Sequence, residues 1–212
     1  TDRASFADWA IVFTDSNSTA DAAHTVAQVL KPDGSVITMQ NGIGNVEKLV
    51  EHLGAERVVG GSSMCSAASA GPGHVLFTHL ATTTIGELDG ARTARIEALA
   101  ALLESTGLII QIGEQIMAKI WNKFVLNCGV NALCATTGLR SGEMTRIPEL
   151  YALQSRIIKE ALEVVAAKGI ELPDSDPWTT IKYSSYHKFN QPSMLQHVLA
   201  GKRTEIDAIN GA

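Results

Sequence analysis

The chain lacks the features that mark several common protein classes. Its longest apolar runs are short and broken by polar residues, so no transmembrane helix is predicted. The net charge is -5 and there is no run of Lys or Arg, which argues against a nucleic-acid-binding protein. With 212 residues, 45% hydrophobic and 18% charged, the composition suits a soluble globular protein of one or two domains.

The three cysteines form no recognisable metal-binding or redox motif. Cys65, Cys128 and Cys134 show neither CxxC spacing nor a Cys/His ligand pattern. We therefore interpret them as buried, reduced thiols of a cytoplasmic protein and expect no metal site. No secretory signal is visible in the sequence.

The glycine fingerprint of a dinucleotide-binding domain is also missing. Such a domain opens with a strand, a GxGxxG turn and a helix. Gly42-Ile43-Gly44 follows a predicted strand, but the third glycine is absent, so this loop alone is a weak phosphate signal. The chain begins with Thr1 and ends in a segment of helical pattern, from which we expect a fragment at both ends.

Up to about residue 112, β-rich runs alternate with helical stretches. The runs predict strands at residues 9–13, 35–39, 58–68, 74–78, 82–85 and 108–112. The helices are predicted at residues 18–30, 45–53 and 91–105. Residues 31–34 predict a turn, and Ser18 or Asn17 is the expected N-cap of the first helix. This order predicts an α/β sheet of parallel strands, with a buried first strand.

From residue 113 onward the sequence carries no strand signal. Helices are predicted at residues 114–135, 148–168, 179–187 and 192–199, and a last one from about residue 204. Gly169 is the expected stop of the second of these helices. The second half is therefore predicted to be all-α.

One predicted helix carries a polar stripe. Lys123, Asn127 and Asn131 are spaced i, i+4 and i+8, so they share one face, while apolar residues occupy most of the rest. Each unpaired polar group in a protein interior costs about 1–3 kcal/mol. We therefore expect a ligand or another polar element against the stripe, and a lysine beside a carbonyl can act as an acid.

Four segments together resemble the ketopantoate reductase (2-dehydropantoate 2-reductase) family. They are residues 40–44 (QNGIG), 121–131 (WNK followed by two asparagines), 190–196 (NQPSMLQ) and 204–211 (TEIDAING). The last two motifs, separated by a short spacer, are the most specific. Their order and spacing also fit, so the resemblance spans nearly the whole chain.

The resemblance implies a fold, a cofactor and a reaction. Residues 1–112 would be the C-terminal part of an α/β Rossmann-type NADP-binding domain whose N-terminal part is missing. Residues 113–212 would be the all-helical substrate and dimerisation domain, cut short at its end. The implied activity is NADPH-dependent reduction of 2-dehydropantoate to pantoate in pantothenate and coenzyme A biosynthesis, and a homodimer is expected.

The resemblance also implies roles for particular residues. Lys123 and Glu205 match the catalytic lysine and glutamate: Lys123 would polarise the carbonyl and supply a proton, and Glu205 would bond the substrate hydroxyl. The positions that match substrate-binding residues are Asn127, Asn131, Asn190 and Ser193. The positions that match the cofactor-binding loop are Asn41 and Gly42.

Each of these residues also has a purely structural interpretation. Lys123 could lie on the surface with its aliphatic stem along the helix, and Asn127 and Asn131 could join helices. Asn190 and Ser193 could cap a short helix, and Glu205 could be a first-turn acid that favours the helix dipole. The Asn-Gly pair of the loop could be an ordinary turn.

The substrate stays open at this point. The family often has a lysine just after the strand that here ends at Phe13, where this chain has Thr14-Asp15-Ser16. An anion therefore replaces a cation near the cofactor. The family also includes reductases of other 2-keto acids, so a related 2-hydroxyacid dehydrogenase is an alternative. A further alternative is a non-catalytic fragment that folds and dimerises.

Overall fold

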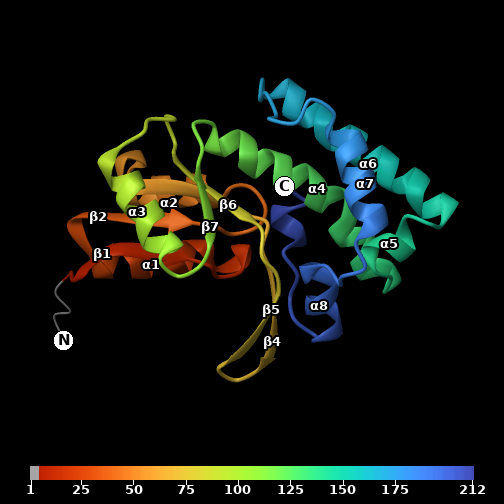
Figure 1. Ribbon diagram of the computed structural model, residues 1–212, viewed down its shortest axis with the longest axis horizontal. Helices are drawn as coiled ribbons and strands as arrows, with labels where there is room; N and C mark the ends of the chain where they lie inside the picture. The colour runs from red at the N-terminus through yellow and green to blue at the C-terminus, as the bar shows by residue number, and fades with distance from the viewer. Residues whose placement is uncertain (1–4) are drawn as a thin grey trace. The chain divides into compact units, whose positions relative to one another are not determined.

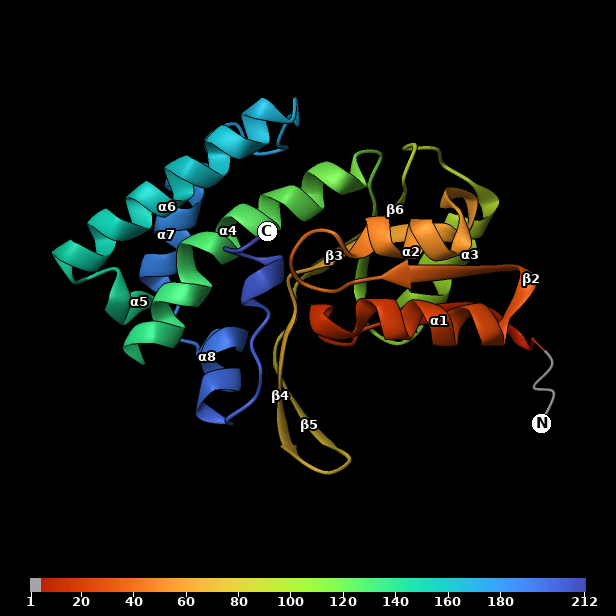
Figure 2. The same cartoon turned by 180° about the vertical axis from the view of Figure 1, so that it is seen from behind.

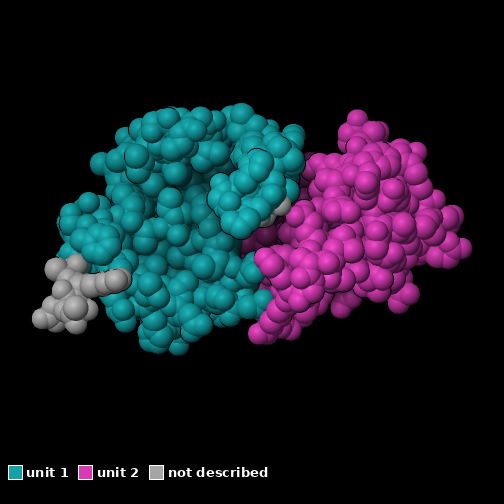
Figure 3. Space-filling view, turned by 90° about the horizontal axis from the view of Figure 1, so that it is seen from below, with its two compact units in different colours: residues 1–40, 45–117 teal, residues 41–44, 118–212 magenta. Residues whose placement is uncertain are grey.

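The computed structural model describes residues 5–212, which divide into two compact units (Figures 1 and 3). One unit contains the chain up to Gln40 together with Asn45–Met117. The other contains Asn41–Gly44 and Ala118–Ala212, so a four-residue loop from the first half of the sequence belongs to the helical unit. Within residues 5–212, no helix is both long and apolar enough to cross a membrane.

The first unit is built on a five-stranded sheet in the order β1-β2-β3-β6-β7. Its strands are β1 (Ala7–Val12), β2 (Leu30–Thr38), β3 (Val58–Ser63), β6 (Thr82–Glu87) and β7 (Ile109–Ile112). All neighbours are parallel except β3 and β6, which are antiparallel. The prediction of a parallel sheet is therefore wrong at this pair, because the chain returns through a hairpin instead of a crossover helix.

Three helices accompany this sheet. They are α1 (Thr19–Val29), α2 (Asn45–Leu53) and α3 (Ala94–Glu104), with short 3-10 turns at Ser16–Ser18 and Ala55–Arg57. Ser18 does precede α1, but its side chain makes no capping hydrogen bond. Buried residues of α3 and of the central strands form one core: Ile37, Met39, Val59, Ile85, Ile96, Leu99, Ala100 and Leu103. The predicted helices are thus confirmed to within a few residues.

The predicted turn at residues 31–34 lies inside β2 as an irregularity of the strand. Ala7 pairs with Leu30 and Trp9 with Ser35, so the chain of β2 bulges between these two pairs. Arg57 donates from Nε to the carbonyl of Gly34 at 2.9 Å and from Nη2 to that of Lys31 at 2.7 Å. The side chain thus supplies partners to carbonyls of the bulge.

The predicted strand at residues 58–68 is divided in two. β3 ends at Ser63, and β4 (Ser66–Gly71) pairs with β5 (His74–His79) in a separate two-stranded sheet. Both ribbon views show this hairpin as a projecting arm (Figures 1 and 2). Its Val75, Leu76 and Phe77 are more than half exposed, which the apolar pattern did not indicate.

The first strand is less buried than predicted. Among residues 5–212, β1 is the outermost strand next to β2. Ile11 is 46% exposed, and Phe13, directly after the strand, is 64% exposed. The apolar run at residues 9–13 correctly indicated a strand, whereas the side chains of Ile11 and Phe13 are not buried by residues 5–212.

The second unit is all-α in the residues that the structure describes, as predicted. Its elements are α4 (Ile116–Thr137, whose first two residues count with the other unit), α5 (Ser141–Met144), α6 (Pro148–Ala167), α7 (Pro177–His187), α8 (Ser193–Leu199) and η3 (Ile206–Ala208). Gly169, at φ +67°, follows α6 as expected. The structure differs from the prediction at two places. Helix α5 lies where no helix was predicted, and the last predicted helix is only a 3-10 turn.

Helix α4 is the centre of this unit. Its residues Trp121, Phe124, Val125 and Cys128 share a core with Ile158, Ala161 and Val165 of α6, Ile181 of α7, Met194 of α8, and Ile209. Further along, its residues Val130, Leu133 and Cys134 pack with Met144 and Leu195. Burial raises the pKa of the Cys128 and Cys134 thiols to about 12, which agrees with the interpretation of both as inert packing residues.

Candidate active site

The polar stripe of α4 lies beside this apolar core. Lys123 and Asn127 are half-buried, and Asn131 is only 4% exposed. Their neighbours Phe124, Val125 and Cys128 are buried on the side that faces the core. The predicted arrangement, a polar row on an otherwise packed helix, is therefore present.

Two amide atoms of α4 are buried without a hydrogen-bond partner among residues 5–212, one on this stripe and one beside it. They are Nδ2 of Asn127, a donor, and Oδ1 of Asn122, an acceptor. Buried polar atoms in folded proteins almost always have partners, so each such exception needs an explanation. Asn122 was not among the predicted site residues. The sequence could have identified Asn122 as a candidate, because it is a polar amide between Trp121 and Lys123 on a largely apolar helix.

The predicted cofactor loop packs within the same unit. Ile43 donates its backbone N–H to the carbonyl of Ala208 at 3.0 Å. Gly42 has φ +80°, and a Cβ there would overlap the same carbonyl and lie 2.9 Å from the Ala208 Cβ. Gly44 also has positive φ, but no heavy atom lies within 4 Å of where its Cβ would be. The loop therefore needs glycine at position 42 for close packing, whereas its backbone at Gly44 is open.

The C-terminal segment connects this loop with α4. Glu205 is 5% exposed and comes directly before η3. Asn210 donates from Nδ2 to the backbone carbonyl of Cys128, the residue after Asn127, at 3.0 Å. Hydrogen bonds thus join three distant parts of the sequence: the loop to Ala208, and Asn210 to the middle of α4. Asn210 belongs to the 204–211 motif but was not among the predicted site residues.

The remaining predicted pair lies at the start of α8. Ser193 is half-buried and is the first residue of the helix, whereas Asn190 is exposed and precedes it. The N-cap position is occupied by Pro192 and shows no side-chain capping bond, so the interpretation of these residues as a cap is wrong. Within the described chain, Asn190 makes no hydrogen bond to the stripe. Leu195, two residues beyond Ser193, packs against α4.

The first unit contains two polar networks of a different kind. At the ends of β1 and β2, Gln40 donates to the carbonyl of Thr14 at 2.8 Å and to Oγ1 of Thr19 at 2.9 Å. Thr19 in turn donates to Oδ1 of Asn45 at 2.7 Å, and Asn45 donates to Oγ of Ser16 at 3.3 Å. Two residues of the segment that departs from the family pattern are thus part of a hydrogen-bonded network.

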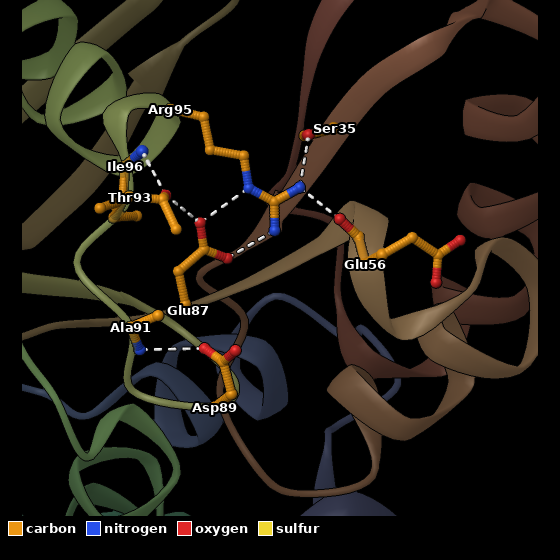
Figure 4. Close-up of polar contacts among 8 residues, drawn as sticks. All are labelled: Ser35, Glu56, Glu87, Asp89, Ala91, Thr93, Arg95 and Ile96. Carbon is orange, nitrogen blue, oxygen red and sulfur yellow. Dashed lines mark hydrogen bonds and ion pairs between the residues drawn. The ribbon is translucent and has the colours of Figure 1, made fainter.

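The second network surrounds the buried carboxylate of Glu87 (Figure 4). Arg95 donates to it from Nε at 2.7 Å and from Nη2 at 2.5 Å, and Thr93 donates from Oγ1 at 2.5 Å. Arg95 also donates to Ser35 Oγ at 3.1 Å and to the carbonyl of Glu56. The hydrogen bond from Arg95 lowers the pKa of Glu87 below its ordinary value. This network fastens β6 to α3 and to neighbouring elements of the same unit.

Models of one protein family match nearly the whole chain. The model "Ketopantoate reductase PanE/ApbA" matches residues 2–90, and "Ketopantoate reductase PanE/ApbA C terminal" matches residues 115–212. The 2-dehydropantoate 2-reductase of Halobacterium salinarum is 31% identical over 97% of this chain and 68% of its own length. That of Archaeoglobus fulgidus is 32% identical over the same shares.

Solved structures of the same architecture are also similar. The PanE/ApbA family ketopantoate reductase from Ralstonia eutropha has a TM-score of 0.87 and 29% identity, over 96% of this chain and 66% of that one. D-mandelate dehydrogenase with NADH and anilino(oxo)acetate has a TM-score of 0.88 and 25% identity, over 96% and 67%. The chain spans about two thirds of the length of these proteins. The predicted fold class, a Rossmann-type α/β part followed by helices, is confirmed, and the chain belongs to the ketopantoate reductase family.

Proposed function

We propose that this protein catalyses the NADPH-dependent reduction of 2-dehydropantoate to pantoate. The observation that carries the proposal is the buried, unpartnered amide nitrogen of Asn127, one helical turn from the half-buried Lys123. A donor of this kind, next to a cationic acid, suits a substrate with a carbonyl and a carboxylate. The name of the curated relatives, 2-dehydropantoate 2-reductase, supplies the substrate.

The chain's own residues fit a nicotinamide cofactor at one point. The backbone of Gly44 is open at positive φ, and the loop is held to the C-terminal segment by Ile43. Asn41 and Gly42 would hold the nicotinamide end, as the resemblance implies. The sequence contains no GxGxxG turn, so the 212 residues include no such cradle for the pyrophosphate. When bound, the cofactor supplies a hydride to the keto carbon.

The side chains of the helical unit perform the acid–base part of the reaction. The Lys123 ammonium polarises the keto oxygen and gives that oxygen a proton as negative charge develops on it. Asn127 and Asn131 orient the substrate's polar groups from the same helix face. Glu205 accepts a hydrogen bond from the substrate hydroxyl, and Asn190 and Ser193 bind its carboxylate or hydroxyl.

The direct test is NADPH oxidation by the purified protein in its natural full length, with and without 2-dehydropantoate. We expect oxidation that depends on the keto acid and saturates with it. A ketone of similar size without a carboxylate is the matched control, and it should react at least about 100-fold more slowly, because the carboxylate contacts are lost. NADPH binding without turnover of 2-dehydropantoate would refute the proposed substrate.

A second candidate is a reductase of a bulkier or branched 2-keto acid. The observation that favours it is the likeness to D-mandelate dehydrogenase, whose TM-score of 0.88 is similar to the 0.87 of the Ralstonia eutropha ketopantoate reductase. A panel of 2-keto acids with aliphatic and aromatic side chains, assayed with NADPH and with NADH, separates the two candidates. A higher kcat/KM for an aromatic 2-keto acid than for 2-dehydropantoate would establish the second candidate and reject the first.

A further inference from the structure

The connection between α7 and α8 carries one predicted substrate-binding residue and leads into the other. It runs over residues 188–192, between His187 at the end of α7 and Ser193 at the start of α8. Asn190 lies in the middle of this connection and is exposed. Its position, and that of Ser193, therefore depends on how the connection is held.

Arg146, which follows the short helix α5, holds the beginning of this connection. Its guanidinium carbon lies 3.9 Å from the centre of the Tyr186 ring and 4.8 Å from that of Phe189. Its Nη1 donates to the carbonyl of Tyr186 at 3.0 Å and to that of Gly142. One planar cation thus contacts two rings and two carbonyls. The compact ammonium of a lysine could not reproduce this set of contacts.

The backbone of α5 adds two further contacts to the same place. Gly142 donates its N–H to the carbonyl of Lys188 at 2.7 Å, and Ser141 donates from Oγ to the carbonyl of Ser185 at 3.2 Å. A Cβ at Gly142 would lie 2.9 Å from the Lys188 oxygen and 3.0 Å from Cζ of Phe189. Helix α5 therefore packs directly against the last turn of α7 and the start of the connection.

The far end of the connection is held from α8. Gln196 donates from Nε2 to the carbonyl of Gln191 at 2.8 Å. Pro192 is buried, and Met194 and Leu195 are 4% and 1% exposed in the core. Asn190 thus lies between two fixed neighbours, although its own side chain is exposed. Such an arrangement orders an exposed residue before a ligand arrives.

We propose that Arg146 is a positioning residue for substrate binding. It fixes residues 186–189 and thereby sets where Asn190 and Ser193 meet the substrate's carboxylate. The inference rests on the proposed function, because those two residues are assigned to the substrate there. Arg146 itself contacts no substrate in this role, so its loss changes substrate affinity much more than the chemical step.

The kinetic test compares Arg146→Met and Arg146→Lys with the exposed control Arg156→Met on α6. We expect the KM for the keto acid to rise about tenfold in Arg146→Met and less in Arg146→Lys, while kcat stays within about threefold. The KM for NADPH and all constants of Arg156→Met should be unchanged. An unchanged KM for the keto acid in a folded Arg146 variant overturns the proposal, and Arg146→Lys carries the test if Arg146→Met does not fold.

Amide hydrogen exchange of the 212-residue chain tests the same contact without activity. Exchange of the Gly142 and Lys188 amides, which donate to the carbonyls of Lys188 and Ser185, should become about tenfold faster in Arg146→Met, with the α4 amides unaffected. Unchanged exchange overturns the role of Arg146 in holding the connection, and faster exchange with an unchanged KM overturns its role in substrate binding. If the wild-type protein reduces no 2-keto acid, the proposed function fails by that result, whereas exchange still decides how the connection is held.

Discussion

Two regions of this molecule bury amides and charged groups in opposite ways. In the first unit, Glu87 receives hydrogen bonds from Arg95 and Thr93, and Asn45 uses both its oxygen and its nitrogen. On α4 of the second unit, Asn127 and Asn122 each keep one buried amide atom without a partner in the described chain. The polar groups of the first region form a structural network, whereas the unpartnered amide atoms of the second are typical of a ligand-binding surface.

The difference has a physical meaning. A buried polar group that is fully hydrogen-bonded stabilises or at least does not destabilise the fold, while an unpartnered one costs about 1–3 kcal/mol. A ligand that forms the missing hydrogen bond removes this destabilisation and stabilises the folded protein. We therefore expect substitutions in the first region to change stability and substitutions in the second to change binding.

The largest expected effect is that of Lys123→Ala on catalysis. Removal of the proposed acid should lower kcat of the natural full-length enzyme by a factor of at least about 100, the usual scale of a lost general acid. Lys159→Ala, whose side chain is 79% exposed on α6, is the control and should leave kcat unchanged. Steady-state NADPH oxidation measures both, and a loss below about threefold in Lys123→Ala would show that another group donates the proton.

The second largest effect is expected when the cation of the Glu87 network is removed. Arg95→Met leaves the Glu87 carboxylate buried without its main partner and should lower the free energy of unfolding by about 2 kcal/mol, a value that allows for the partial exposure of Arg95. Arg92→Met, from an exposed ion pair with Glu97, is the matched control, with an expected loss below about 1 kcal/mol. Urea titration measures both, and equal losses would contradict a special role of the buried pair.

The third prediction compares the same substitution in both regions. Asn45→Leu should lower the free energy of unfolding by about 1–3 kcal/mol, since Thr19 Oγ1 and Ser16 Oγ each lose a buried hydrogen bond with the Asn45 amide. Asn127→Leu should lower it by less than about 0.5 kcal/mol or raise it, because it removes a donor that was already unpartnered. At the same time Asn127→Leu should abolish keto acid binding. Comparable destabilisation by both variants in urea titrations would show that the two amides contribute equally to stability.

The smallest effect concerns the pH dependence of the Glu87–Arg95 pair. The pKa of Glu87 is lowered from its ordinary value of 4.5, chiefly by the hydrogen bond from Arg95. The stabilisation is therefore complete above the unfolded-state pKa and is lost as pH falls through the lower, folded-state pKa. The stability difference between wild type and Arg95→Met should therefore shrink on acidification, most clearly as pH falls below 4.5. A difference that grows on acidification would show that the sign is wrong.

Local pattern predicted most of the secondary structure and all three residues of the α4 stripe. Period 3.6 located α4, α6 and α7 to within a few residues, and apolar runs located every strand of the sheet. The wrong predictions concern burial, which depends on the neighbouring elements. An apolar run does not reveal that the β4–β5 hairpin projects, because burial depends on what packs against a strand.

The residues of the site divide in the same way. Spacing alone determined that Lys123, Asn127 and Asn131 share a helix face, because the helix period is a property of the backbone. Only the tertiary structure decided that Asn210 reaches Cys128, that Arg146 contacts Tyr186 and Phe189, and that Nδ2 of Asn127 has no partner among residues 5–212. Such pairings join residues up to 82 positions apart, and they follow from packing, which no local pattern encodes.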